Sequence, residues 1–289
     1  MTAVFIFLAL CVAGVAVLLL VFQDKLMYFP SAYTPWELAK AESEGIQRLE
    51  FTTAEGRQVA FYQPPAASAS AEALPPEDLW FVYCGNGSRV LDLSPLFQHL
   101  PDAAEASRGM LLLDYPGYGA SEGKPSPAST LASGHAALAA LWAKKGWSGE
   151  PGATTNYHFL GHSLGSAGTL QLAAGLGRAQ SVILMSPFTS MRDMANARVT
   201  PAFSWLLQHN FDNRAALSTL LTAAPQAKVT LVHGTKDTAI PVAMSRQLAA
   251  AHPGKVTLVE LPDADHNDFV FDQLPLIQSL ILGQEAVPR

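Results

Sequence analysis

Short runs of apolar residues recur along the chain, and polar or helix-forming segments separate them. The runs do not alternate between apolar and polar positions, which is typical of strands buried on both faces of a sheet. They cover residues 79–84, 109–115, 157–160, 181–186, 228–233 and 255–261. Helix-forming segments lie at about 129–145, after Ser163, at 242–251 and at 269–282. This order of strands and helices predicts an α/β fold with a mostly parallel sheet flanked by helices.

Two segments depart from this rhythm. Residues 46–65 alternate between apolar and polar positions and turn at Ala54-Glu55-Gly56, which predicts a hairpin. Residues 187–224 contain no recognisable strand but many large apolar side chains, namely Met191, Met194, Phe203, Trp205, Leu206, Leu207 and Phe211. They fit either a helix pair packed on the core or a small cap at about 188–224, with some of these side chains lining an apolar pocket.

The N-terminus is the most apolar part of the chain. Residues 3–22 carry no charge and are long enough to cross a bilayer core of roughly 30 Å. Because the run lacks a basic start and a small-residue cleavage site, we expect a retained single-pass membrane anchor rather than a signal peptide. We therefore divide the chain into an anchor, residues 1–25, and one folded domain, residues 26–289. Lys25 is the only basic residue near the run, so the sequence leaves the side of the membrane open.

Composition narrows the possible functions. The chain of 289 residues is 49% hydrophobic and has a formal net charge of -6 without a basic patch, which argues against a nucleic-acid partner. The two cysteines, Cys11 and Cys84, suggest no disulfide framework. No paired metal-ligand spacing is present. The glycines at 114–119 do not form a nucleotide loop, because Pro116 interrupts them and the lysine is missing. We expect no metal and no cofactor.

The motif Gly161-His162-Ser163-Leu164-Gly165 lies between an apolar strand and a small-residue helix. A sharp strand-to-helix turn pushes its central side chain clear of the backbone, and glycine two positions before and after prevents collisions with the neighbouring strand and helix. The alternative is a flexible loop, but the flanking strand and helix favour a nucleophile elbow. Ser163 is therefore the candidate nucleophile, and adjacent His162 points elsewhere and cannot be its base.

A serine nucleophile needs a base, and the base needs a carboxylate that orients it. His266 lies in a polar loop after the last predicted strand, and Asp237 follows the end of the strand at 228–233. Such loops meet at the carboxyl edge of a parallel sheet. Asp263 and Asp265 are too close to His266 in sequence to orient its ring, and we expect them to face water. The resulting order, Ser163, Asp237, His266, is that of α/β serine hydrolases.

The oxyanion that forms during acyl transfer needs preplaced hydrogen-bond donors. The backbone N–H of Leu164, directly after the nucleophile, is one candidate. The segment Cys84-Gly85-Asn86-Gly87 follows a strand in the position of the second donor, and we assign that role to the N–H of Asn86. Cys84 itself is expected to be a buried strand residue rather than a second nucleophile, because no cationic partner lies near it.

These residues resemble the α/β-hydrolase superfamily, and more narrowly its membrane-anchored ABHD and bud-emergence-like serine hydrolases. The resemblance is carried in family order by residues 27–30, 85–87, 114–121, 161–165, 186–190, 233–237 and 265–267. It implies Ser163 as nucleophile, Asp237 as acid and His266 as base. It also implies an esterase, lysophospholipase, acyl-protein thioesterase or peptidase. The chain departs from the family at Cys84, where relatives often carry a histidine.

The sequence thus predicts a membrane-anchored serine hydrolase that cleaves carboxylic esters or thioesters through an acyl-enzyme. Its expected partners are an acyl-ester, lipid or acylated-protein substrate and a membrane bound through the N-terminal helix. Two alternatives remain open. One is a serine peptidase on the same fold, because both reactions share the tetrahedral step. The other is a non-catalytic, membrane-anchored interaction protein, because fold alone does not fix function.

Overall fold

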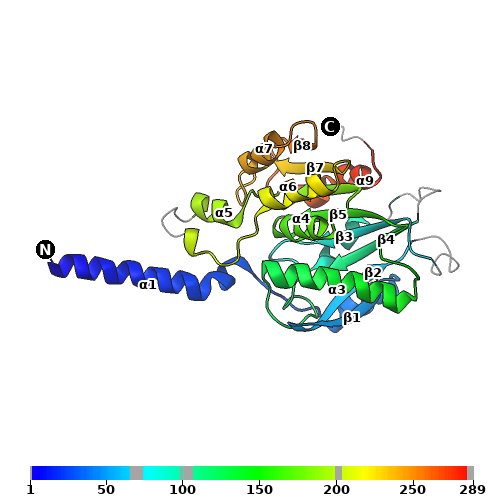
Figure 1. Cartoon of the computed structure of the whole chain (residues 1–289), viewed down its shortest axis with the longest axis horizontal. Helices are drawn as coiled ribbons and strands as arrows, with labels where there is room; N and C mark the ends of the chain where they lie inside the picture. The colour runs from blue at the N-terminus through cyan, green and yellow to red at the C-terminus, as the bar shows by residue number, and fades with distance from the viewer. Residues whose placement is uncertain (1, 66–73, 98–99, 101–106, 199–203, 285–289) are drawn as a thin grey trace.

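A computed structural model describes residues 2–65, 74–97, 100, 107–198 and 204–284. Within these ranges eight strands form one sheet, in the order β1-β2-β4-β3-β5-β6-β7-β8 (Figure 1). The strands are β1 (Gln47–Thr53), β2 (Gly56–Gln63), β3 (Asp78–Tyr83), β4 (Arg108–Leu113), β5 (Asn156–His162), β6 (Ser181–Met185), β7 (Lys228–Gly234) and β8 (Val256–Leu261). β2 is antiparallel to both of its neighbours, and the strands from β4 to β8 are parallel. The mostly parallel sheet and its N-terminal hairpin are confirmed.

Helices cover both faces of this sheet (Figure 1). One face packs against α3 (Pro127–Lys145), α4 (Leu164–Leu176), α6 (Asn213–Ala223) and α7 (Val242–Ala250). The other packs against α2 (Pro35–Ser43), the 3-10 helix η2 (Val90–Leu96), α8 (Asp268–Asp272) and α9 (Leu274–Ile281). Successive residues of β3 face opposite layers, with Phe81 in the first core and Val82 in the second. Both are fully buried, which explains why this strand shows no polar alternation.

Two helices differ from expectation. α2 has no counterpart among the predicted elements, although Thr34 and Glu37 form a capping box around its first turn and Pro35 begins it. The helix expected at 269–282 is split into α8 and α9. Pro275 lies at the start of α9, where its missing N–H and its ring would interrupt a continuous helix.

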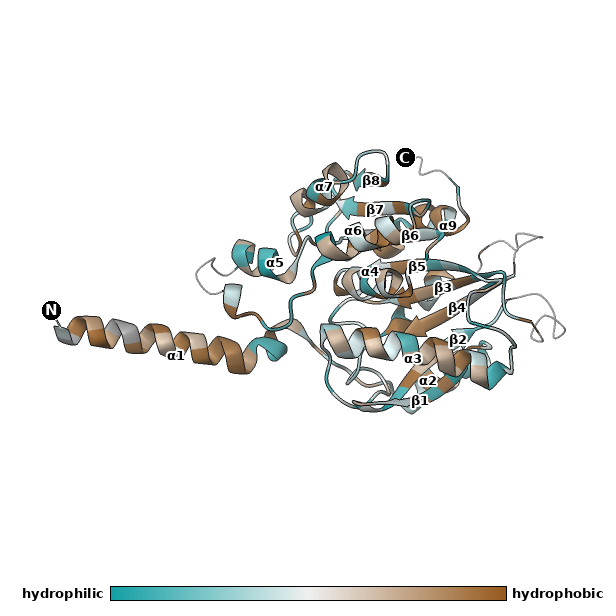
Figure 2. Ribbon diagram, in the orientation of Figure 1, coloured by the Kyte–Doolittle hydropathy of each residue, from teal (hydrophilic) through white to brown (hydrophobic). Residues whose placement is uncertain are grey.

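The N-terminal helix α1 (Thr2–Met27) projects away from the domain, and many of its described apolar side chains are exposed (Figures 1 and 2). Residues Val4–Met27 contain an 18-residue window with a mean hydropathy of 3.2 and are long and apolar enough to cross a membrane. The last turn of α1 is hydrogen-bonded to the domain at two places. The Gln23 side chain is buried and accepts a hydrogen bond from the N–H of Gln208 (2.8 Å). The Asn86 side-chain amide donates to the carbonyl of Met27 (2.9 Å).

The segment expected as a cap at about 188–224 divides into two parts. α6 packs against α4, and its Leu217 and Leu220 are fully buried in the core. Among the described elements of this segment, α5 (Met191–Arg198) and the 3-10 helix η3 (Ser204–Leu206) are the ones that project beyond the carboxyl ends of the strands, beside the end of α1 (Figure 1). The overhanging part is therefore smaller than the expected cap, because the apolar face of α6 is buried in the helix layer. Phe203, one of the expected cap residues, lies outside the described residues.

Candidate active site

Ser163 occupies a strained turn between β5 and α4. Its backbone angles, φ 56° and ψ -121°, are rare for a residue with a side chain. A Cβ atom on Gly161 would overlap the backbone carbonyl of Gly165. One on Gly165 would overlap the carbonyl oxygens of Tyr83 and Cys84. The two glycines are thus required by close backbone packing, as the sequence motif predicts.

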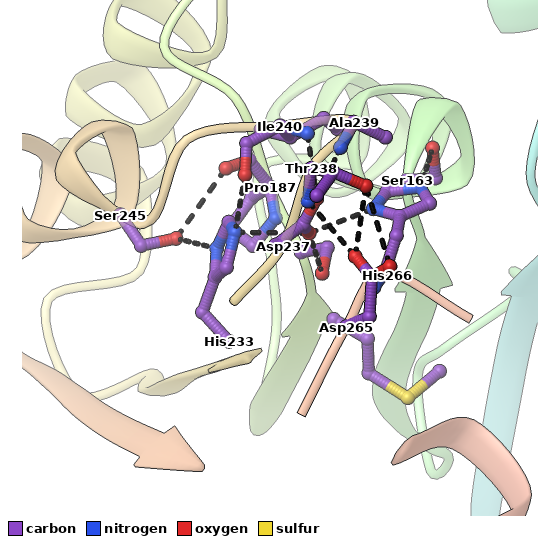
Figure 3. A network of polar contacts seen from close by, with 12 residues as sticks. Ser163, Pro187, His233, Asp237, Thr238, Ala239, Ile240, Ser245, Asp265 and His266 are labelled. Carbon is purple, nitrogen blue, oxygen red and sulfur yellow. Dashed lines mark hydrogen bonds and ion pairs between the residues drawn. The ribbon is translucent and has the colours of Figure 1, made fainter. Parts of the chain in front are cut away.

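The structure brings together the three side chains selected from the sequence (Figure 3). The Nε2 atom of His266 lies 2.9 Å from Oγ of Ser163, and its Nδ1 atom lies 2.7 Å from Oδ2 of Asp237. Ser163 comes from the β5–α4 turn, Asp237 from the loop after β7 and His266 from the loop after β8. All three loops leave the carboxyl edge of the sheet. With Nδ1–H donating to the carboxylate, Nε2 is left to accept the serine proton.

Asp237 is fully enclosed and accepts hydrogen bonds at both oxygens. Oδ1 accepts from the N–H groups of Ala239 (2.9 Å) and Ile240 (2.7 Å). Besides His266, Oδ2 accepts from the Ser186 hydroxyl at 2.8 Å. Burial alone would raise the pKa of Asp237, but hydrogen bonds from His233, His266 and Ile240 outweigh it and lower the pKa well below its ordinary value. Asp237 therefore stays ionised beside His266.

His233 and Ser186 support Asp237 and were not predicted as parts of the site. Nε2 of His233 lies 2.9 Å from the Ile240 carbonyl and 3.1 Å from Oδ2 of Asp237. Because both partners are acceptors, this nitrogen carries the proton. Ser186 directly follows β6 and has a positive φ of 47°, and its buried hydroxyl points to Asp237. A serine directly after a buried strand is the signal that could have identified it.

Two further contacts hold the loop that carries His266. Oδ1 of Asp265 accepts from the N–H of His266 (2.7 Å) and from that of Thr238 (2.8 Å), tying this loop to the Asp237 loop. Asp265 is partly exposed, as expected, and in addition has this positioning role, which was not predicted. Nε2–H of His162 donates to the His266 carbonyl (3.0 Å). Burial, followed by the nearby imidazole of His266, lowers the pKa of His162 to about 4. His162 is therefore a neutral donor at pH 7.

A pocket of about 470 Å³ opens over Ser163. Its wall includes Asn86 and Leu164, the residues expected to supply the oxyanion donors. The Asn86 side chain is turned toward Met27, which leaves its backbone N–H as the candidate donor. The Cys84 thiol donates to the Ser88 carbonyl (2.9 Å) across this loop, and burial raises the pKa of the thiol. Cys84 is thus a buried structural residue, as expected.

The rest of the pocket wall contains both polar and apolar residues. Its large apolar side chains are Phe188 before α5, Met191 and Met194 of α5, Met27 from the end of α1 and Ile240. Among the cap residues named from the sequence, Trp205 is exposed and Phe211 is buried in the core, so neither lines this pocket. Within the described ranges no group of histidine, cysteine or carboxylate side chains is arranged to hold a metal ion.

The fold and this site together define an α/β hydrolase. The sequence profile of the alpha/beta hydrolase family matches residues 81–225, and the chain belongs to that family. An uncharacterized protein of Mycobacterium tuberculosis is 29% identical over 268 residues, covering 90% of this chain and 86% of the relative. An esterase of Pyrococcus furiosus superposes with a TM-score of 0.62 at 15% identity, covering 88% and 95% of the two chains. A membrane phospholipase A superposes with a TM-score of 0.57 at 14% identity, covering 98% and 99%.

Proposed function

We propose that this protein is a membrane-anchored serine hydrolase that cleaves carboxylic esters or thioesters of acyl substrates. The observation that carries the proposal is the continuous chain of hydrogen bonds from Ser163 through His266 to the enclosed carboxylate of Asp237. This chain ends at the floor of an open pocket, so a substrate carbonyl can reach the serine hydroxyl. A buried network of purely structural value would not need to open into a pocket.

In the proposed reaction Oγ of Ser163 attacks the acyl carbonyl while Nε2 of His266 takes its proton. The charge on the imidazolium is stabilised by Asp237. The negative oxygen of the tetrahedral intermediate is bound by the N–H groups of Leu164 and Asn86. Protonation of the leaving alcohol or thiol by His266 then gives the acyl-enzyme. Water deprotonated by His266 attacks that ester, and a second tetrahedral intermediate collapses to the free acid and Ser163.

An acyl substrate is favoured by the methionines in the pocket wall and by α1. Methionine side chains adapt to flexible alkyl chains, and Met27, Met191 and Met194 all contribute to the pocket. With α1 retained as an anchor, the site lies next to a bilayer that holds lipids and acylated proteins. The similarity to an esterase and to a membrane phospholipase A supports this choice among the reactions open to a serine hydrolase.

The direct test is labelling of the purified chain with a fluorophosphonate, which reacts with activated serines. We expect wild type and the exposed-serine control Ser218→Ala to be labelled, and Ser163→Ala to be unlabelled while still folded. Ester hydrolysis by Ser163→Ala should fall at least about a thousandfold in kcat/KM. A preference for aminoacyl-nitroanilides over p-nitrophenyl esters would instead indicate a peptidase. An unlabelled, inactive wild type would indicate a non-catalytic interaction protein.

A further inference from the structure

A second cavity lies between the end of α1 and the overhanging segment. It has a volume of about 220 Å³ and is lined by Leu19 and Leu26 of α1, Ala195 of α5 and Leu207 after η3, among other residues. We infer that this cavity is the site that holds the long acyl chain of the substrate, so that the anchor helix itself forms one wall of the acyl site. The inference rests on the proposed function and specifies its substrate as a long-chain acyl lipid.

The cavity adjoins the pocket over Ser163. Met27, Met191 and Met194 line both spaces, so one row of side chains separates them and faces each. An acyl group attached to Ser163 would pass these three methionines and enter the second cavity. Methionine suits this position, because its unbranched thioether side chain can shift to admit an alkyl chain.

The polar groups in the cavity wall leave little for a polar ligand to bind. The Gln23 side chain donates to the Leu20 carbonyl (3.1 Å) and accepts from the N–H of Gln208 (2.8 Å). The Arg198 guanidinium donates to the carbonyls of Thr238 and Ala239. Gln23 and the Nη2 group of Arg198 thus bond to protein groups, and most of the other lining residues are leucine or methionine. Such a lining is suited to an alkyl chain and would leave a polar group without hydrogen bonds.

The position of the cavity explains how an acyl chain reaches it. Leu19 and Leu26 belong to the helix that is long and apolar enough to cross a membrane, and Figure 1 shows α5 beside the last turns of that helix. With α1 inserted, the cavity lies at the bilayer end of the domain. An acyl chain then moves from the lipid phase into the site without crossing water, which avoids the cost of hydrating its methylene groups.

The test uses tryptophan substitutions that narrow the cavity from either side, and it measures the preference of each variant for long over short acyl esters. Ala195→Trp fills it from α5 and Leu19→Trp from α1. Ala197→Trp and Leu18→Trp are matched controls, because both residues are exposed and neither lines the cavity. The full chain is assayed in detergent micelles with p-nitrophenyl butyrate and p-nitrophenyl palmitate. Fluorophosphonate labelling of each variant confirms that the Ser163 site is folded.

We expect both cavity variants to lower the palmitate-to-butyrate ratio of kcat/KM at least about tenfold, because each buried methylene contributes roughly a factor of four. The two controls should keep the wild-type ratio. An unchanged ratio in variants that are still labelled would overturn the inference while leaving the proposed hydrolase intact. A wild type that is neither labelled nor active on either ester would instead overturn the proposed function itself.

Discussion

At the scale of single residues, His162 bonds to the loop that carries His266, and its titration makes protein stability depend on pH. Its pKa is lowered to about 4 in the folded chain, against about 6.5 when unfolded. Between these values the unfolded chain binds a proton that the folded chain does not, so the free energy of unfolding falls as the pH falls. The loss is about 2 kcal/mol between pH 7.5 and pH 5. Urea unfolding of the detergent-solubilised chain at both pH values measures it.

The contribution of His162 is isolated by comparing the wild type with His162→Gln. This control is needed because Asp114 changes the unfolding free energy with pH in the opposite direction. Burial raises the pKa of Asp114 to about 6, so its contribution is present at low pH and lost as the pH rises through 6. Asp114 is common to both proteins and cancels in their difference. Glutamine can still donate to the His266 carbonyl but cannot be protonated. Equal pH dependence in wild type and His162→Gln would show that His162 does not contribute in this way.

Residue types and chain order were sufficient to select Ser163, Asp237 and His266, because each follows a buried strand at the same edge of the sheet. Ser186 and Asp265 were missed as supporting residues, and the contact of His233 with Asp237 was not predicted. Their contacts depend on how three loops pack against one another, and such packing leaves no periodic pattern in the sequence. Ser186 and Asp265 each bridge segments that are distant in the chain, 51 residues apart for Ser186 and Asp237 and 27 for Thr238 and Asp265.

At the scale of elements, the β5–α4 turn depends on the absence of a side chain at Gly165. Gly165→Ala would place a methyl group against the carbonyls of Tyr83 and Cys84 and push α4 away from β3. We expect a loss of about 2–4 kcal/mol in unfolding free energy. We also expect a lower kcat/KM, because the displacement would separate Leu164 at the start of α4 from Asn86 in the loop after β3, the two residues proposed to bind the oxyanion. Urea unfolding and ester hydrolysis measure the two effects.

Gly168→Ala is the matched control on the same helix. A Cβ there would meet its neighbours at ordinary contact distances, 3.4 Å from Cγ2 of Thr130. Alanine is the better helix former, so stability should be unchanged or rise by up to about 1 kcal/mol. Similar destabilisation by Gly165→Ala and Gly168→Ala would mean that close approach to β3 is not what requires glycine.

Elements were predictable where hydrophobic pattern alone determines them. The central strands are buried on both faces, so continuous apolar runs identified them. α2 was missed because it is short and weakly apolar, and its Thr34–Glu37 capping box was the available signal. The extent of the cap was not predictable, because an apolar helix face looks the same whether it covers a pocket or, like that of α6, packs against α4.

At the scale of the whole molecule, the proposed function assigns membrane attachment to α1 and the chemistry to the domain. Removing residues 1–18 eliminates most of the exposed apolar helix but keeps Leu19 and Gln23. We expect the full chain to float with lipid vesicles and the truncated chain to remain mostly in the aqueous fraction. Both should be labelled by the fluorophosphonate. Floating of the truncated chain, or cleavage of the N-terminal segment from the full chain in cells, would contradict a retained anchor.

The junction between α1 and the domain has a mechanical consequence. The hydrogen bonds from Gln208 to Gln23 and from Asn86 to Met27 hold the last turn of α1 directly against the domain. If α1 is inserted as proposed, the Ser163 hydroxyl is held at a fixed height above the lipid headgroups. We then expect acyl bonds that lie at this height to be cleaved faster than equally reactive bonds on long soluble substrates. Selectivity would be set by this height before any pocket residue distinguishes one acyl group from another.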